Sequence, residues 1–226
     1  MAQPNLISAR TRSPIDTRTG VQISNVLRNT YLLLSMTLAF SAATAVASMA
    51  MNAPYPGFLI TIIGFFGLLY AVHKTADSAL GILFTFLFTG FLGFVAGPIL
   101  NAYLSLANGP NLVASALGTT AAAFIGLSAY AVITRRDFSF LSGFLVVGFF
   151  VLMGAVVLSF FFDLSAFSVA ISCGFVLFAS AAILWQTSAI VHGGETNYIR
   201  ATVTLYVSFY NLFMSLLHIF GAMSDE

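Results

Sequence analysis

Residues 140–162 read FLSGFLVVGFFVLMGAVVLSFFF, a stretch without one charged side chain. An α-helix needs about 20 consecutive apolar residues to cross roughly 30 Å of hydrocarbon. Backbone polar groups in lipid must be bonded inside the protein, and a helix satisfies them within a single segment. The stretch therefore predicts a transmembrane helix.

The rest of the chain has the same character, since 59% of its 226 residues are hydrophobic and only 7% are charged. A soluble domain devotes about a quarter of its residues to charge. We therefore predict an all-α fold class, a polytopic membrane protein built as a bundle of seven transmembrane helices. The predicted spans are residues 31–51, 57–73, 79–103, 112–133, 140–162, 166–187 and 201–221, with Pro98 expected to kink or end the third.

Positive charge separates cleanly between the two sides of this predicted topology. The segments at 52–56, 104–111 and 163–165 contain no Lys or Arg. Cytoplasmic loops retain Lys and Arg. The set formed by the amino-terminal segment and the loops after the second, fourth and sixth spans is therefore predicted to be cytoplasmic. The eight basic residues of that set are Arg10, Arg12, Arg18, Arg28, Lys74, Arg135, Arg136 and Arg200.

This orientation places the amino terminus in the cytoplasm and the carboxyl end in the periplasm. Residues 1–29 are polar and are predicted to form a flexible cytoplasmic tail, because no short apolar region of a cleavable signal opens the chain. Residues 30–222 are predicted as the membrane domain, and residues 223–226 as a short periplasmic end.

Several functional classes are disfavoured by what the sequence contains. Its basic residues are scattered and form no nucleic-acid patch. Cys173, the single cysteine, lies in an apolar run and is read as a small hydrophobic residue. The sequence shows no catalytic signature such as H-E-x-x-H, G-x-S-x-G or a P-loop. We therefore predict no enzyme activity, no cofactor and no metal centre.

Polar side chains follow one face of the last predicted span, where their spacing alternates between four and three residues. Unpaired polar groups are costly in hydrocarbon, so this face should point into the bundle and make the last span a central helix. Two interpretations remain open, namely hydrogen bonds that fix helix register and the lining of an ion or proton path. The candidates for this polar core or pore are Thr204, Ser208, Asn211, Ser215 and His218, with Gln186 on the preceding span.

Two further features concern packing and turns. Gly93 with Gly97, and the run of Gly118, Ala122 and Gly126, have the four-residue spacing that lets membrane helices approach closely. The polar loop 192–200 contains paired glycines, and Thr196 precedes the last span as a possible helix cap.

Three stretches of the sequence resemble the Bax-inhibitor (TMBIM) family, and in particular its bacterial YccA-type branch. They are VLRNTY at 26–31, GFLG with GPILN between 90 and 101, and HGGETNYIRATVTLYVSFYNLF from His192. The resemblance implies a seven-helix inner-membrane protein with a central last helix. It also implies an association with the membrane AAA protease FtsH, which the chain would restrain and of which it would be a substrate.

Under this hypothesis the protease engages the polar tail, and Arg10, Arg12 and Arg18 mark the candidate handle. The alternative implied by the family is a calcium leak channel, whose pH sensing depends on two aspartates. The matching positions here are Gln186 and Ser208, which cannot titrate near neutrality. The resemblance therefore favours a protease modulator over a pH-gated channel, while weak cation binding by amide and hydroxyl oxygens stays open.

Overall fold

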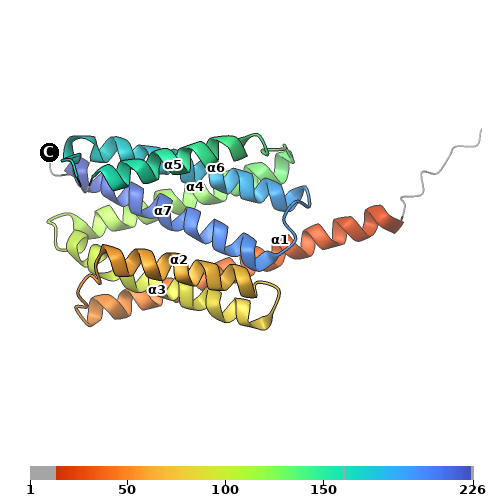
Figure 1. The fold of residues 1–226 in the computed structure, drawn as a ribbon, viewed down its shortest axis with the longest axis horizontal. Helices are drawn as coiled ribbons and strands as arrows, with labels where there is room; N and C mark the ends of the chain where they lie inside the picture. Colours follow the sequence, from red (N-terminus) through yellow and green to blue (C-terminus); the bar gives the residue numbers. More distant parts are fainter. Residues whose placement is uncertain (1–13, 160, 225–226) are drawn as a thin grey trace, which may run out of the picture.

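The computed structural model describes residues 14–159 and 161–224, and within these ranges the secondary structure is helical, with no strand. Seven of the described helices are long and apolar enough to cross a membrane, and they lie side by side in one bundle (Figure 1). The predicted all-α, seven-span fold class is confirmed. The helices are α1 (Pro14–Ala50), α2 (Phe58–Thr75), α3 (Ala79–Leu104), α4 (Gly109–Thr134), α5 (Leu141–Leu158), α6 (Ser168–Val191) and α7 (Tyr198–Ser224), with a short 3₁₀ turn at Ser165–Phe167.

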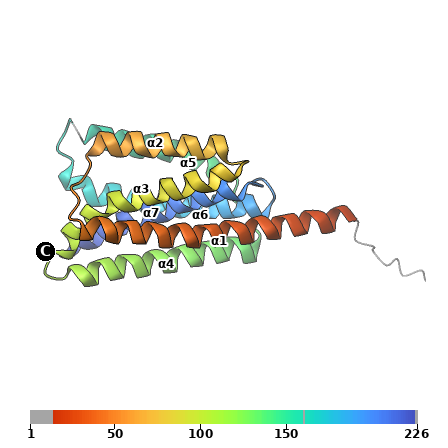
Figure 2. The same cartoon turned by 90° about the horizontal axis from the view of Figure 1, so that it is seen from below.

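The first helix begins earlier than the sequence predicts. The expected boundary at residue 29 falls inside α1, which runs from Pro14 to Ala50 without a break. Proline suits the first turn of a helix because its missing N–H has no intrahelical partner there. The outer part of α1 projects past the ends of the other helices (Figure 2). Of the predicted handle residues, Arg18 lies in this helix, whereas Arg10 and Arg12 lie outside the described residues.

Other helix ends also shift from their predicted positions. Pro98 does not end α3, which continues to Leu104. Proline is tolerated in membrane helices because neighbouring groups satisfy the backbone that it leaves unpaired. The helix α5 ends at Leu158, short of the predicted residue 162, while α7 begins at Tyr198 and continues to Ser224, past the predicted end of the membrane domain.

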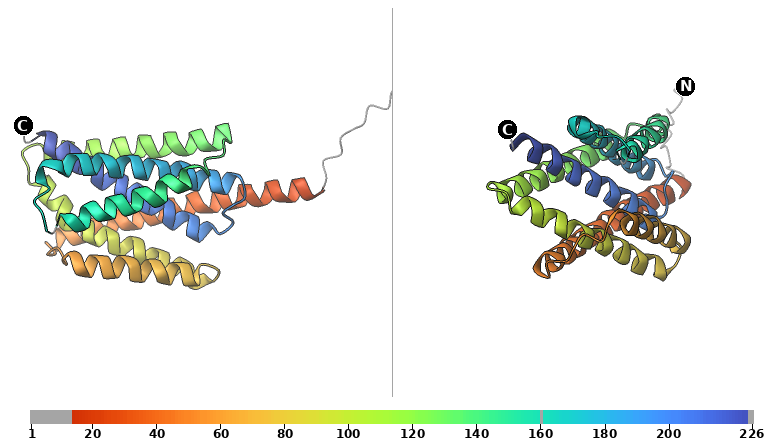
Figure 3. Two further views of the ribbon diagram at one scale, coloured as in Figure 1. Left: turned by 45° about the horizontal axis from the view of Figure 1, so that its top comes forward. Right: turned by 60° about the vertical axis from the view of Figure 1, so that its left-hand side comes forward.

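The last helix is central, as predicted. Among the described residues, α7 packs against each other spanning helix except α5. Figure 3 shows α7 crossing the middle of the bundle, with α5 at the outside. Five described α7 side chains belong to the main hydrophobic core, namely Ile199, Val203, Leu205, Tyr206 and Leu212. A span surrounded by protein can bury polar groups against partners, which a span facing lipid cannot do.

The two predicted small-residue stripes have different environments. Gly93 and Gly97 of α3 lie against α1, where an added methyl group would collide with backbone or side-chain atoms of Ser41 and Ser48. Gly118 and Gly126 of α4 face open space, because beyond the adjoining α4 backbone no atom of the described residues lies within 4 Å of an added methyl. The prediction that the α4 stripe packs helices of this chain is therefore wrong, although its spacing is equally suitable.

Candidate functional site

The described basic side chains gather at one end of the bundle, called here the charged end. Lys74 lies in the last turn of α2, Arg135 and Arg136 follow α4, and Arg200 lies in the first turn of α7. The helices alternate in direction, so these positions meet at the end from which α1 projects (Figure 1).

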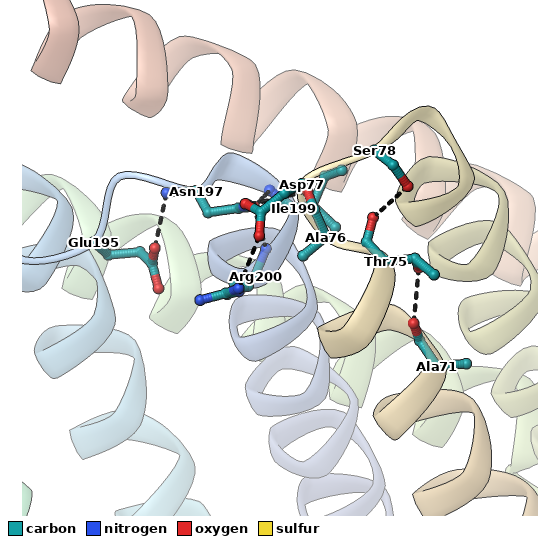
Figure 4. Close-up of polar contacts among 9 residues, drawn as sticks. All are labelled: Ala71, Thr75, Ala76, Asp77, Ser78, Glu195, Asn197, Ile199 and Arg200. Carbon is teal, nitrogen blue, oxygen red and sulfur yellow. Dashed lines mark hydrogen bonds and ion pairs between the residues drawn. The ribbon is translucent and has the colours of Figure 1, made fainter.

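The loops at the charged end are joined by a first clasp centred on Asn197 (Figure 4). Its side-chain amide donates to the carbonyl oxygen of Ala76 at 3.0 Å and to Asp77 Oδ1 at 2.8 Å. Its side-chain oxygen accepts the backbone N–H groups of Ile199 at 2.9 Å and Arg200 at 3.1 Å. Asn197 therefore caps α7 and holds the α2–α3 loop at the same time.

The sequence-based assignment of Thr196 as the cap of the last helix is corrected by this geometry. Asn197 accepts from the free amides of α7, whereas Glu195 Oε1 accepts the backbone N–H of Asn197 at 2.8 Å. An ion pair adds a second link, because Arg200 Nη2 lies 3.2 Å from Asp77 Oδ2. The Asp77 side chain is 81% exposed and that of Arg200 42% exposed, so water screens their attraction.

A second clasp ties the α4–α5 loop to the end of α6. Ser188 Oγ donates to the carbonyl oxygen of Arg136 at 3.1 Å and accepts the backbone N–H of Phe138 at 3.0 Å. His192 Nε2 lies 3.1 Å from the carbonyl oxygen of Arg135. In the same loop the backbone N–H of Ser139 donates to Asp137, which lowers the pKa of that carboxyl group. The first clasp uses Asn197 of the polar loop 192–200, and the second uses His192 of that loop with Ser188 in the last turn of α6.

The predicted polar core residues of α7 are placed in two ways. Ser208 and Ser215 are buried, at 4% and 8% exposure, whereas Thr204, Asn211 and His218 are half-buried. Ser208 Oγ donates to the carbonyl oxygen of Thr204 at 2.9 Å, within its own helix. His218 Nδ1 lies 3.4 Å from the Tyr103 hydroxyl near the end of α3.

Gln186, the predicted polar residue of α6, is also buried, at 3% exposure. Its side-chain Nε2 has no hydrogen-bond partner among the described residues. Leaving a buried donor unpaired costs about 1–3 kcal/mol. The Nε2 group is therefore a buried donor that finds no partner among the described residues.

The sequence interpretation missed a second polar face of α7, which points toward α1 and α3. The Tyr206 hydroxyl lies 2.6 Å from Ser41 Oγ and donates to the carbonyl oxygen of Thr89 at 3.1 Å. Thr202 Oγ1 reaches the carbonyl oxygen of Thr30 at 3.2 Å. Thr202 and Tyr206 are four residues apart and share a face, but tyrosine also suits apolar packing, so the sequence pattern did not separate them from the core.

Comparisons with known proteins agree with this architecture. The model of the family described as inhibitor of apoptosis-promoting Bax1 matches residues 23–225. The chain belongs to the Bax inhibitor family. The match includes α1 from residue 23 onward, all of α2 to α7, and both clasps. The resemblance inferred from the sequence is confirmed.

Relatives in this Bax inhibitor family align with nearly the whole chain. An uncharacterised protein of Pseudomonas aeruginosa is 58% identical over 91% of this chain and 92% of its own length. The modulator of FtsH protease YccA of Escherichia coli K12 is 54% identical, covering 89% of this chain and 91% of the relative. A protein of another E. coli strain with the same identity is named inner membrane protein YccA. The chain is thus a multi-pass membrane protein of the same kind.

Proposed function

We propose that the chain binds and restrains a membrane AAA protease of the FtsH type, and that it is itself drawn into that protease through its amino-terminal segment. The observation that carries this proposal is the 54% identity to the E. coli modulator of FtsH protease, over 91% of that protein. Identity of this extent spans the membrane domain rather than one shared motif.

The proposal places the charged end in the cytoplasm and the carboxyl end in the periplasm, in the inner membrane. Its support is the gathering of Lys74, Arg135, Arg136 and Arg200 at one end of the bundle, because cytoplasmic loops keep an excess of Lys and Arg. A cytoplasmic protease would then meet the side of the molecule on which α1 projects.

The projecting part of α1 supplies a suitable handle. Gln22, Ser24, Asn25 and Arg28 are exposed, and Thr30 is the first fully buried residue among those whose burial is described. A single projecting helix makes few tertiary contacts and can unfold locally at low cost. The motor would therefore grip α1 at Arg18 without first disturbing the bundle.

Resistance to extraction would begin once the pull reached the bundle. Beyond Thr30, α1 packs against α3, α6 and α7, and the Gly93 and Gly97 contacts bring its backbone close to α3. The two clasps hold the loops on the same side. A substrate that is easily gripped and slowly unfolded would occupy the protease and so spare other substrates.

The test removes the handle and leaves the packed residues intact. Deleting residues 2–21 keeps Ile23, whose side chain lies 4.0 Å from the position of a methyl added at Gly193. We expect a longer half-life in cells that contain the protease, and no change in half-life in cells that lack it. The matched control replaces residues 2–21 with a flexible Gly/Ser segment of equal length, which should keep the protein short-lived.

Restraint is measured in the same cells as the half-life of a second membrane substrate. Overproducing the full-length chain should lengthen that half-life, and overproducing the deletion should not. If the deletion is degraded as fast as the full-length chain, the handle is rejected. If the full-length chain also fails to be captured with a proteolytically inactive protease, the modulator function is rejected as well.

A second candidate, a cation leak through the bundle, is favoured by one observation. Gln186 is buried, and its Nε2 has no hydrogen-bond partner in the part of the chain that the structure describes. Buried polar groups of this kind mark ion pathways in membrane proteins. The buried Ser208 hydroxyl adds an oxygen on α7 that could coordinate a cation weakly. Calcium is the ion to test first, with flux measured in liposomes.

A further inference from the structure

A cavity opens between α1 and α4 in the half of the bundle away from the charged end. In the described part of the chain, no Cα atom of α1 lies within 8 Å of a Cα atom of α4. The space between them has a volume of about 260 Å³, and α3 and α7 form its floor. Figure 2 shows α1 and α4 as two long helices on the same side of the bundle.

The cavity wall is apolar and opens toward lipid. Val46 of α1 and Leu117 of α4 line it and remain 59% and 49% exposed. Its floor includes Tyr206, Phe209 and Phe213 of α7. The hydroxyl of Tyr206 is already engaged by Ser41 and the Thr89 carbonyl, so that group needs no polar ligand.

The length of the cavity matches one leaflet of a bilayer. On α1 it extends from Leu38 to Met49, which at a rise of 1.5 Å per residue is about 16 Å. Half of a hydrocarbon core roughly 30 Å thick is about 15 Å. Because α1 ends at Ala50 and α4 begins at Gly109, the outer mouth lies near the membrane surface and the inner end near the bilayer centre.

We propose that this cavity binds one acyl chain of a phospholipid from the leaflet opposite the charged end. The chain enters between α1 and α4, with its carboxyl-proximal part beside Met49 and its methyl end beside Leu38 and Tyr206. A transmembrane helix of a partner could cover the mouth but not enter, because a helix about 10 Å across fills on the order of 1,200 Å³ over this length. The occupant follows from the apolar wall, the lateral opening and the depth.

The experiment uses the full-length protein in phosphatidylethanolamine liposomes that carry a photoreactive diazirine on one acyl chain. One probe has the diazirine near the ester and the other near the terminal methyl. After irradiation, adducts are mapped by mass spectrometry. We expect the ester-proximal probe to label Met49 and Val113, and the methyl-proximal probe to label Leu38 and Tyr206.

Two tryptophan variants distinguish labelling from within the cavity from labelling by general contact with lipid. Ala42 lines the cavity, whereas its exposed neighbour Ala43 does not. In Ala42→Trp, labelling of the α7 floor relative to the lipid-facing Phe150 should fall about fivefold, because the indole ring fills the space. Ala43→Trp should leave that ratio unchanged, and equal melting temperatures of the two variants would show that both fold.

The proposal is overturned if both probes label the same residues in the same proportions, or if Ala42→Trp leaves labelling of the floor unchanged. It is also overturned if the floor is not labelled at all while size measurements show a dimer, because a second copy would then cover the groove. None of these three results would affect the proposed protease function, which depends on the charged end.

Discussion

The side-chain Nδ2 of Asn197, just before α7, donates to Asp77 in the α2–α3 loop at 2.8 Å. The side-chain Oδ1 of the same residue caps α7 by accepting two backbone N–H groups of its first turn. One amide thus fixes both the beginning of the central helix and the position of a loop from the other half of the chain. The adjacent ion pair between Asp77 and Arg200 is exposed, with a separation of 3.2 Å. The amide and the ion pair should therefore contribute unequally to stability.

Replacing Asn197 with Ala removes a helix cap and two bonds to the α2–α3 loop. We expect the free energy of unfolding to fall by about 1–2 kcal/mol, mainly through the lost cap. Arg200→Gln should cost no more than about 1 kcal/mol, because exposed ion pairs contribute little. Thermal unfolding in mild detergent measures both, with Thr196→Ala as the matched control. A larger loss in Thr196→Ala than in Asn197→Ala would contradict the observed cap.

Replacing Ser188 with Ala should loosen the α4–α5 loop. The change leaves the backbone N–H of Phe138 without its partner at 3.0 Å, and Phe138 is buried. An unpaired buried donor costs about 1–3 kcal/mol. Hydrogen exchange should show faster exchange at residues 135–140 in Ser188→Ala and no change in the exposed control Ser142→Ala. Equal exchange in both variants would show that the second clasp does not hold the loop.

The two glycine stripes should respond oppositely to added methyl groups. Gly93→Ala would force Cβ against the Ser41 carbonyl of α1, and overpacking of this kind costs about 1–3 kcal/mol. The methyl group of Gly118→Ala meets no described residue outside the adjoining α4 backbone. The change should leave the melting temperature unchanged or raised, since alanine favours a helix over glycine. A marked loss in Gly118→Ala would instead indicate that another polypeptide packs on α4.

Calcium flux tests the leak candidate directly. If Gln186 and Ser208 lie on a cation path, calcium-loaded liposomes that contain the purified chain should release calcium faster than calcium-loaded liposomes without protein. The double variant Gln186→Asp with Ser208→Asp should make that release pH-dependent between about pH 6 and pH 8, because burial and a neighbouring carboxylate raise the pKa of a carboxyl group. Wild-type flux equal to that of empty vesicles across this range would reject the leak.

The number of spans, the central position of the last helix and the gathering of positive charge could be read from the sequence. Each depends on short-range chemistry. A helix must satisfy its own backbone in lipid, so the length of an apolar run identifies a span. A polar stripe such as Ser208 with Ser215 must be covered by protein, so its helix is placed inside.

Other features were decided only by tertiary packing. Gly93 with Gly97 and Gly118 with Gly126 follow small-residue spacing, yet only the first pair contacts another helix of the chain. Thr196 and Asn197 are both able to cap a helix, and the position of the Ala76 carbonyl and Asp77 favours Asn197. In each case the deciding atoms come from residues distant in the chain.

The sequence by itself therefore determined which segments are helices in the membrane and which end of the bundle carries positive charge, because lipid imposes those properties on each segment separately. The structure alone decided which helix faces meet, how Asn197 and Ser188 fasten the loops, and where the cavity between α1 and α4 lies. Those features depend on contacts between helices, whose energies belong to pairs of distant residues and are not encoded in any single segment.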